Sequence, residues 1–324
     1  MRDLYITNNG KLNRKDDSLL FTNKTTKKIV PIKDIDNIYV FSEITINTKL
    51  LTFLSKLNIE MYFYNYYGFY SGAFTPRKKE VSGKLLVEQV KNYLDKESRL
   101  SISKEFLYGS IHNMRKTLMQ YKLNEEAEKI KAYEKNVKDV KNIQNLMLKE
   151  AEIKEFYYKQ INKIIRNKDF FFVKRVRNPP DNFINTLISF GNSLLYTTIL
   201  SELFKTQLNP TISYLHEPFE RRYSLNLDIA DIFKPLVVDR VIFSLINRQQ
   251  IKPEHFNKEL NFCYLSKEGR YIFLREYDNK LRTTIKYPGL NRKVSYKYMF
   301  RLEGYKLIKF LLENKKYKAF KIYW

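Results

Sequence analysis

The feature that most constrains the fold of this chain is a change in the spacing of its apolar residues near residue 76. Up to Pro76 the apolar residues lie in short runs, which alternate with turn-forming stretches such as Asn8–Gly10 and Lys15–Asp17. From about Leu85 onward they recur at helical spacing over long stretches. Short runs between turns are typical of strands, and the longer pattern is typical of helices. The sequence therefore predicts a β-rich first part and a helical remainder.

The first part contains several β-prone runs, a predicted short helix over Thr48–Leu57 and a buried strand over Glu60–Tyr64. The runs before the helix are Asp3–Thr7, Leu19–Phe21, Lys28–Pro31 and Asn37–Phe41. Many short strands with closely spaced turns indicate a small antiparallel sheet structure, either a sandwich or an open barrel. We place this domain at residues 1–76, a linker at 77–84 and the helical domain at 85–324.

The helical domain is expected to be all-α. Asn182–Phe204 follows Pro179–Pro180–Asp181, a helix-start signal, and is apolar on most sides, so it is predicted to be the central core helix. Tyr298–Leu312 reads as an amphipathic helix. The predicted fold class is α+β and multidomain, with a small β-sandwich-like domain before a larger all-α domain. No apolar run is expected to span a bilayer, and no signal peptide is evident, so we expect a soluble, cytoplasmic protein.

The charge of the chain indicates a polyanionic partner. There are 59 Lys and Arg residues against 35 Asp and Glu, which gives a formal net charge of +24. Residues 1–76 contain 10 basic and 7 acidic side chains, which leaves 49 and 28 for the remainder. A bias of the whole genome toward lysine is the alternative, but it would spread the excess more evenly. The distribution favours a nucleic-acid surface on the helical domain.

Several chemistries are excluded by the residues that are missing. Cys263 is the single cysteine, so the chain has neither a disulfide framework nor a thiolate metal cage. Only nine glycines occur, and neither a Gly-x-x-x-x-Gly-Lys-Ser/Thr loop nor a Gly-x-Gly-x-x-Gly loop is present. The absence of His-Glu-x-x-His argues against a zinc peptidase.

Asp228 and Asp231 lie three residues apart in an apolar segment, Leu225–Phe233, and so share one face of a predicted helix. Two buried carboxylates repel each other and are costly to desolvate, and a divalent cation would relieve both problems. Oxygen ligands suit Mg²⁺ or Mn²⁺, and His216 as a third ligand would favour Mn²⁺. The alternative is that Asp228 caps the helix or pairs with Arg221 or Arg222, while Asp231 faces solvent.

A further carboxylate, Glu150, shares a predicted helix face with Ile153 and Tyr157. Glu152 and Glu155 lie off that face, so Glu150 is the carboxylate expected to point inward. An ordinary charged helix surface is the alternative for this Glu- and Lys-rich stretch.

These residues, taken in order, closely resemble the CRISPR-associated integrase family, the first-numbered Cas protein, which acts in spacer acquisition. The resemblance covers essentially the whole chain. In the helical domain it is carried by Glu150, Tyr157–Tyr158, Arg177–Asp181, Asn185, Ser189–Gly191, His216–Glu217, Arg222–Leu225, Asp228, Asp231, Phe233–Pro235 and Val237–Arg240. In the β domain it is carried by Gly10–Leu12, Val30–Ile32 and Tyr67–Tyr70.

The resemblance implies a metal-dependent DNA integrase and endonuclease with one Glu, one His and one Asp as metal ligands. Carried over to this chain, the catalytic metal ligands are Glu150, His216 and Asp231, supported by Asp228 and Tyr157. Ala151–Glu152 stands where the family usually has Gly-Asn, and the spacing to Tyr157 favours Glu150 over Glu152.

The family also implies partners. It implies a homodimer formed through the β domains, and two such dimers bridged by a dimer of the small second-numbered CRISPR-associated protein. The substrates would be double-stranded DNA, both a captured fragment and a repeat array. Candidate phosphate contacts are Arg221, Arg222, Lys234 and Arg248. The rival functions are a metal-dependent nuclease of DNA repair or recombination, and a non-catalytic DNA-binding scaffold.

Overall fold

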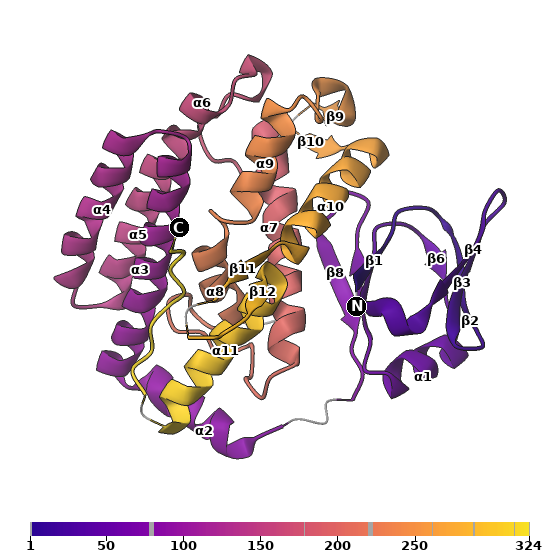
Figure 1. Cartoon of the computed structure of the whole chain (residues 1–324), viewed down its shortest axis with the longest axis horizontal. Helices are drawn as coiled ribbons and strands as arrows, with labels where there is room; N and C mark the ends of the chain where they lie inside the picture. The colour runs from indigo at the N-terminus through magenta and orange to yellow at the C-terminus, as the bar shows by residue number, and fades with distance from the viewer. Residues whose placement is uncertain are drawn as a thin grey trace.

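The computed structural model describes residues 2–77, 81–177, 179–219, 223–260, 262–287, 289–313 and 315–323. A β-rich first part lies beside one side of a larger helical part (Figure 1). The predicted fold class is therefore confirmed. The last strand of the first part ends at Phe74, and the first helix of the second part begins at Gly83.

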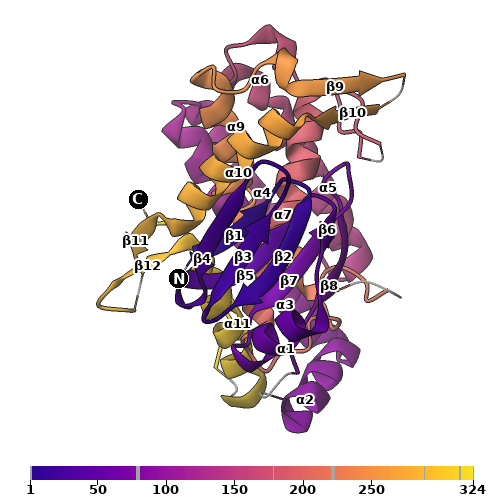
Figure 2. The ribbon, with the colours of Figure 1, turned by 90° about the vertical axis from the view of Figure 1, so that its right-hand side faces the viewer.

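The β-rich part contains two four-stranded sheets, and Figure 2 shows them toward the viewer. One sheet has the order β1 (Arg2–Ile6), β5 (Ile35–Val40), β7 (Glu60–Tyr64) and β8 (Tyr70–Phe74). The other has the order β4 (Lys27–Pro31), β3 (Ser18–Thr22), β2 (Gly10–Lys15) and β6 (Ile44–Thr45). The short helices are η1 (Ile32–Asp34) and α1 (Thr48–Lys56), which agrees with the predicted helix.

The prediction of purely antiparallel pairing is wrong, because β1–β5, β5–β7 and β2–β6 pair in parallel. Parallel neighbours need a crossover connection, and antiparallel neighbours need only a tight turn. Here the β2–β3–β4 meander lies between β1 and β5, and α1 lies between β5 and β7. Local turn signals predict the turns within the meander but not the longer crossovers around it.

The sheet that contains β5 is buried on both faces. Ile38 and Val40 pack in the core between the two sheets, whereas Tyr39 and Phe41 join the core of the helical part. Alternate residues of a strand point to opposite faces, so one strand serves both cores. The molecule is thus built in layers, with this sheet between the second sheet and the helices.

The helical part is built around α7 (Phe183–Phe204), which packs against α8, α9 and α11. The other helices are α2 (Gly83–Leu94), α3 (Lys96–Gln120), α4 (Asn124–Lys138), α5 (Ile143–Lys159), α6 (Ile161–Ile164), η2 (Lys168–Phe170), α8 (Leu225–Phe233), α9 (Val238–Asn247), η3 (Pro253–His255), α10 (Lys267–Arg282) and α11 (Tyr296–Glu313). Two hairpins were not predicted: β9 (Phe256–Glu259) with β10 (Phe262–Leu265), and β11 (Thr284–Lys286) with β12 (Lys293–Ser295).

The central helix α7 begins where the sequence predicts, because the Asn182 side chain accepts a hydrogen bond from the backbone of Asn185 and caps it. By length and composition α7 is apolar enough to cross a membrane, so the expectation that no apolar run is that long is wrong. However, 78% of its apolar window is buried inside the protein. The helix therefore forms the centre of the core, as predicted.

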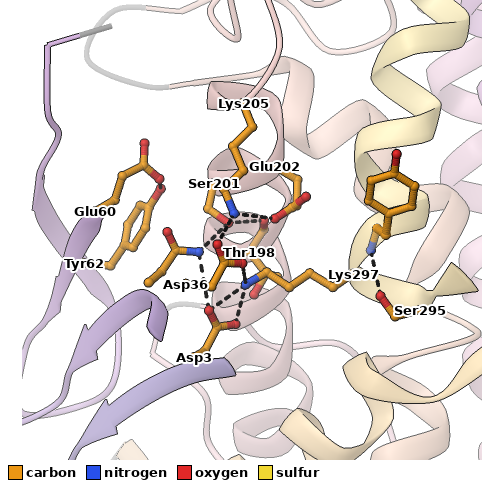
Figure 3. Close-up of polar contacts among 12 residues, drawn as sticks. Asp3, Asp36, Glu60, Tyr62, Thr198, Ser201, Glu202, Lys205, Ser295 and Lys297 are labelled. Atoms are coloured by element: carbon orange, nitrogen blue, oxygen red, sulfur yellow. Dashed lines mark hydrogen bonds and ion pairs between the residues drawn. The ribbon is translucent and has the colours of Figure 1, made fainter. Parts of the chain in front are cut away.

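Partly buried ion pairs join the β-rich part to the helical part (Figure 3). The Lys297 ammonium on α11 lies 2.6 Å from an oxygen of Asp3 on β1 and 2.7 Å from an oxygen of Asp36 on β5. Asp36 also pairs with Lys205 at 2.6 Å, and Lys205 pairs with Glu202 of α7 at 3.0 Å. Burial lowers the pKa of Lys297, but the charges of Asp3 and Asp36 outweigh it and hold that pKa above its usual value.

We predict that Lys297→Met lowers the free energy of unfolding by about 3–5 kcal/mol, because Asp3 would be left buried without its ion-pair partner. Urea unfolding followed by circular dichroism measures the change. Lys293→Met, which removes an exposed lysine from nearby β12, is the control and should leave the midpoint unchanged. Equal midpoints for the two variants would contradict the prediction.

Candidate metal centre

The structure brings together the three residues that were predicted as metal ligands. Glu150 comes from α5, His216 from the loop before α8, and Asp231 from α8. One ligand atom of each residue lies within 4.8 Å of the others. Asp231 is buried, and Glu150 and His216 are half-buried. Three segments that are distant in sequence therefore present two carboxylates and one imidazole to a single point.

The local pattern of α5 explains why Glu150 points inward. Ile153 and Tyr157, on the same helix face, are 0% and 1% exposed. The Glu152 carboxylate instead pairs with Lys149 at 2.8 Å, and its side chain is 50% exposed. The structure thus places Glu150, and not Glu152, at the centre.

Asp228 is the hydrogen-bond acceptor that shapes the loop before α8. Its Oδ2 accepts from the backbone N–H groups of Tyr214 and Leu215 at 2.7 and 3.1 Å. Its Oδ1 accepts from the backbone N–H of His216 at 3.0 Å and from His216 Nδ1 at 2.7 Å. With both oxygens engaged and the side chain 0% exposed, Asp228 holds the loop that carries His216 and does not cap a helix.

The bond to Asp228 also fixes the chemistry of His216. Because an ionised carboxylate only accepts, the neutral His216 ring carries its proton on Nδ1 and leaves the Nε2 lone pair for a metal ion. This is the usual way in which a carboxylate orients a ligating histidine. Burial lowers the pKa of His216, but the hydrogen bond and charge of Asp228 outweigh it and hold the pKa above its ordinary value.

Asp231 is buried at the centre, which rules out the solvent-facing alternative. Its Oδ1 accepts from Lys234 at 2.6 Å and from Lys154 at 3.0 Å. Burial raises the pKa of Asp231, but the charges of Lys154 and Lys234 outweigh it and hold the pKa well below its ordinary value. Its Oδ2 is buried and has no hydrogen-bond partner in the described part of the chain. A buried carboxylate oxygen without a donor is the group that a cation would satisfy.

The residues fit a divalent cation of the kind that was predicted. Two carboxylates and one neutral imidazole, with room for water or phosphate oxygens, suit Mg²⁺ or Mn²⁺. Zinc sites more often use thiolate or several histidine ligands, and the lone Cys263 lies outside this cluster.

Lys154 was missed by the sequence analysis. It lies four residues after Glu150, on the same helix face, and its ammonium contacts both Glu150 and Asp231. The spacing from Glu150 could have indicated this. A divalent cation bound to the two carboxylates would have to compete with this ammonium.

A helix–helix contact holds α8 in place. The Asn113 amide on α3 donates to the Ile232 carbonyl near the end of α8 at 2.8 Å. The same side chain donates to the Phe320 carbonyl and accepts from the Ile322 backbone N–H at 3.0 Å. Thr117, one turn further along α3, donates to the Pro235 carbonyl at 3.1 Å. These bonds fix the position from which Asp231 projects.

The remaining predicted residues fall into different settings. Tyr157 is buried behind Glu150 and faces Asp239, whose pKa burial raises to about 7. Lys234 is buried against Asp231, with its ammonium 4.9 Å from the centre of the Tyr196 ring. Arg248 is exposed at the end of α9. Arg221 and Arg222 lie outside the described residues.

The chain matches known proteins both in sequence and in structure. The family described as "CRISPR associated protein Cas1" matches residues 4–279. A protein of Thermodesulfovibrio yellowstonii, named CRISPR-associated endonuclease Cas1 3, is 47% identical over 100% of both chains. The structure of TM1797, a CAS1 protein from Thermotoga maritima, superposes with a TM-score of 0.90 and 37% identity, over 98% of this chain and 100% of that one.

A more distant solved structure shares only the fold. It is a casposase bound to integration product, with a TM-score of 0.87 at 21% identity over 99% of this chain and 93% of that one. The matches place this chain in the class of CRISPR-associated proteins. Within that class, the chain belongs to the Cas1 family.

We predict that Asp228→Asn weakens Mn²⁺ binding by about 10- to 100-fold, because His216 would lose the carboxylate that orients its ring. Isothermal titration of Mn²⁺ measures the affinity, and near-ultraviolet circular dichroism checks that the fold is kept. Asp139→Asn changes an exposed aspartate after α4 and should bind Mn²⁺ like the wild type. An unchanged affinity in a folded Asp228→Asn variant would remove Asp228 from this role.

We predict the opposite sign for Lys154→Met, which should strengthen Mn²⁺ binding by about tenfold, or about 1.4 kcal/mol. Loss of the ammonium removes a competing cation and makes the electrostatic potential at the two carboxylates more negative. Quenching of the Mn²⁺ electron paramagnetic resonance signal measures the affinity. Lys149→Met, whose lysine pairs with Glu152 on the same helix, is the matched control. Weaker binding by Lys154→Met would contradict the interpretation.

Proposed function

We propose that this chain is the metal-dependent DNA integrase and endonuclease of CRISPR adaptation. In this proposal it inserts captured DNA fragments into a repeat array through attack of a fragment 3′ hydroxyl on a phosphodiester. The observation that carries the proposal is the convergence of Glu150, His216 and Asp231 to within 4.8 Å. The name of the Thermodesulfovibrio relative and the integration product bound to the casposase, which shares the fold, both support it.

Glu150, His216 and Asp231 would hold one Mg²⁺ or Mn²⁺ ion. When bound, the ion supplies positive charge to the phosphate oxygens and to the leaving 3′ oxygen. Asp228 keeps the His216 ring in its ligating orientation. Lys154 and Lys234 add positive charge beside Asp231, where an incoming phosphodiester brings negative charge.

The reaction needs no nucleophile from the protein. The fragment 3′ oxygen forms a new bond to phosphorus, and the bond from phosphorus to the target 3′ oxygen breaks. The proton that the attacking hydroxyl gives up is balanced by the proton that the leaving oxygen takes up to become a hydroxyl. One phosphodiester replaces another, so no nucleotide cofactor is required. The state of Cys263 agrees with a reaction that uses no protein nucleophile, because burial raises the pKa of its thiol and keeps it unreactive.

The partners belong to the same proposal. We infer a homodimer formed through the β-rich parts, and an assembly in which the small second-numbered CRISPR-associated protein bridges two such dimers. Two centres in one assembly would join the two strands at opposite ends of a repeat. We place the reaction in the cytoplasm. Lys234, Arg248, Arg221 and Arg222 stay candidate phosphate contacts.

A hydrolytic nuclease of repair or recombination is the second candidate, because water in place of the 3′ hydroxyl would use the same centre. The word "endonuclease" in the name of the relative favours hydrolysis as one of the activities. Release of cut DNA without any joined product would support this candidate alone. Metal-independent DNA binding without turnover would support the scaffold.

We predict that the wild type, with Mn²⁺ or Mg²⁺, joins a labelled fragment with free 3′ hydroxyls to supercoiled DNA. Glu150→Ala, His216→Ala and Asp231→Ala should each lower the joining rate by at least about 100-fold, since each removes a ligand of the charge-stabilising ion. Glu152→Ala, the outward-facing carboxylate two residues from Glu150, is the control. Gel electrophoresis measures the joined product. Full activity in any ligand variant would remove that residue from the centre.

A further inference from the structure

A site lined by basic side chains lies on the helical part, and none of the three candidate metal ligands lines it. Its main cavity, of about 550 Å³, is formed by residues of α3, α6, α9 and α10. A neighbouring cavity of about 460 Å³ shares Gln120, Arg240 and Lys280 with it. The basic residues that line the two cavities are Lys116, Lys163, Arg166, Arg240, Arg248 and Lys280. Among the described residues, Glu276 is the single carboxylate in the lining.

Basic side chains outnumber carboxylates in the described lining of this site. Burial, together with the charge of Arg240, lowers the pKa of Lys280 to about 8. Lys280 forms no ion pair within the described part of the chain, and its ammonium lies 4.6 Å from the centre of the Tyr296 ring. Glu276 accepts a hydrogen bond from Ser244 at 3.3 Å. Lys280 is partly desolvated and is repelled by Arg240, so an anion bound beside the Lys280 ammonium would stabilise its charge.

Helix α9 lines the cavities and also borders the candidate metal centre, although none of the three candidate ligands lines either cavity. Asp239, in the first turn of α9, is buried and interacts electrostatically with Lys154 and Lys234 of the centre. Arg240, the next residue, lines the cationic cavity instead. A ligand held at Arg240 would therefore be fixed to the helix that also borders the metal centre.

We propose that these two cavities bind backbone phosphates of a DNA strand at a distance from the phosphodiester that reacts. The basic residues are spread over both cavities, as a chain of phosphates requires, and are not gathered around one point as for a single small anion. The exposed Arg166 and Arg248 continue the basic lining to the surface. The inference rests on the proposed function for its choice of DNA as the polyanion.

The test compares two double variants that lose the same charge. Arg248→Gln with Lys280→Gln removes two cations from the site, and Lys129→Gln with Lys135→Gln removes two exposed cations from α4. Fluorescence anisotropy measures binding of a labelled duplex with single-stranded 3′ ends over a range of salt concentrations. For the site variant, the slope of log affinity against log salt should fall by about 2 in magnitude, and affinity at low salt by at least about tenfold.

The α4 variant should keep the wild-type slope, and Lys280→Arg, which keeps the charge, should keep it as well. Equal losses in the two double variants would overturn the proposal, because the effect would then be one of net charge. Calorimetric titration with inorganic phosphate tests whether the site binds a free phosphate ion and not the phosphates of DNA. Binding of phosphate that the site variant loses, with an unchanged DNA slope, would also overturn it.

Two readouts separate this inference from the function itself. Mn²⁺ affinity of the site variant should equal that of the wild type, since the metal ligands are untouched. If it falls together with DNA affinity, the variant has damaged the centre, and a separate phosphate site is refuted. Failure of the wild type to join DNA would refute the proposed function, whereas the salt slopes would still decide whether the cavities bind DNA.

Discussion

The geometry of the candidate metal centre depends on four hydrogen bonds to one buried carboxylate, that of Asp228. Three of them come from consecutive backbone N–H groups of the loop before α8, and the fourth comes from the His216 ring. Asp228 therefore ties the loop to the helix that carries Asp231 one turn later. Without these hydrogen bonds, His216 would have no fixed distance to Asp231, and the three candidate ligands from separate segments would not meet.

Much of the candidate centre was predictable because its residues stand in recognisable patterns within short segments of the sequence. Two aspartates at helical spacing in an apolar segment need a partner, and Glu150 shares its face with residues of a core. The division of labour between Asp228 and Asp231 was implied only by the family resemblance, because the two have the same spacing and surroundings in sequence. Lys154 was missed, since an i+4 lysine reads as an ordinary helix pair until the tertiary fold brings Asp231 to it.

The fold shows the same division between local and distant information. Helix α7 was predicted to within a residue, because capping at Asn182 and an all-round apolar surface are properties of the segment itself. The parallel pairing of β1 with β5 was not, since it depends on a crossover through the meander. The short hairpin β11–β12 has only three residues in each strand, too few to show a period.

Asn113 links the candidate metal centre to a segment that lies far downstream of Asp231 in the sequence. Its amide holds the Ile232 carbonyl of α8 and also two backbone groups of the segment around Phe320 and Ile322. On the ribosome, Glu150, His216 and Asp231 leave the exit tunnel well before Ile322 does. Until then, the α3 face that supports α8 lacks the segment that packs beside it. A divalent cation at the three candidate ligands would therefore have the full support of α8 only after this downstream segment has folded against α3.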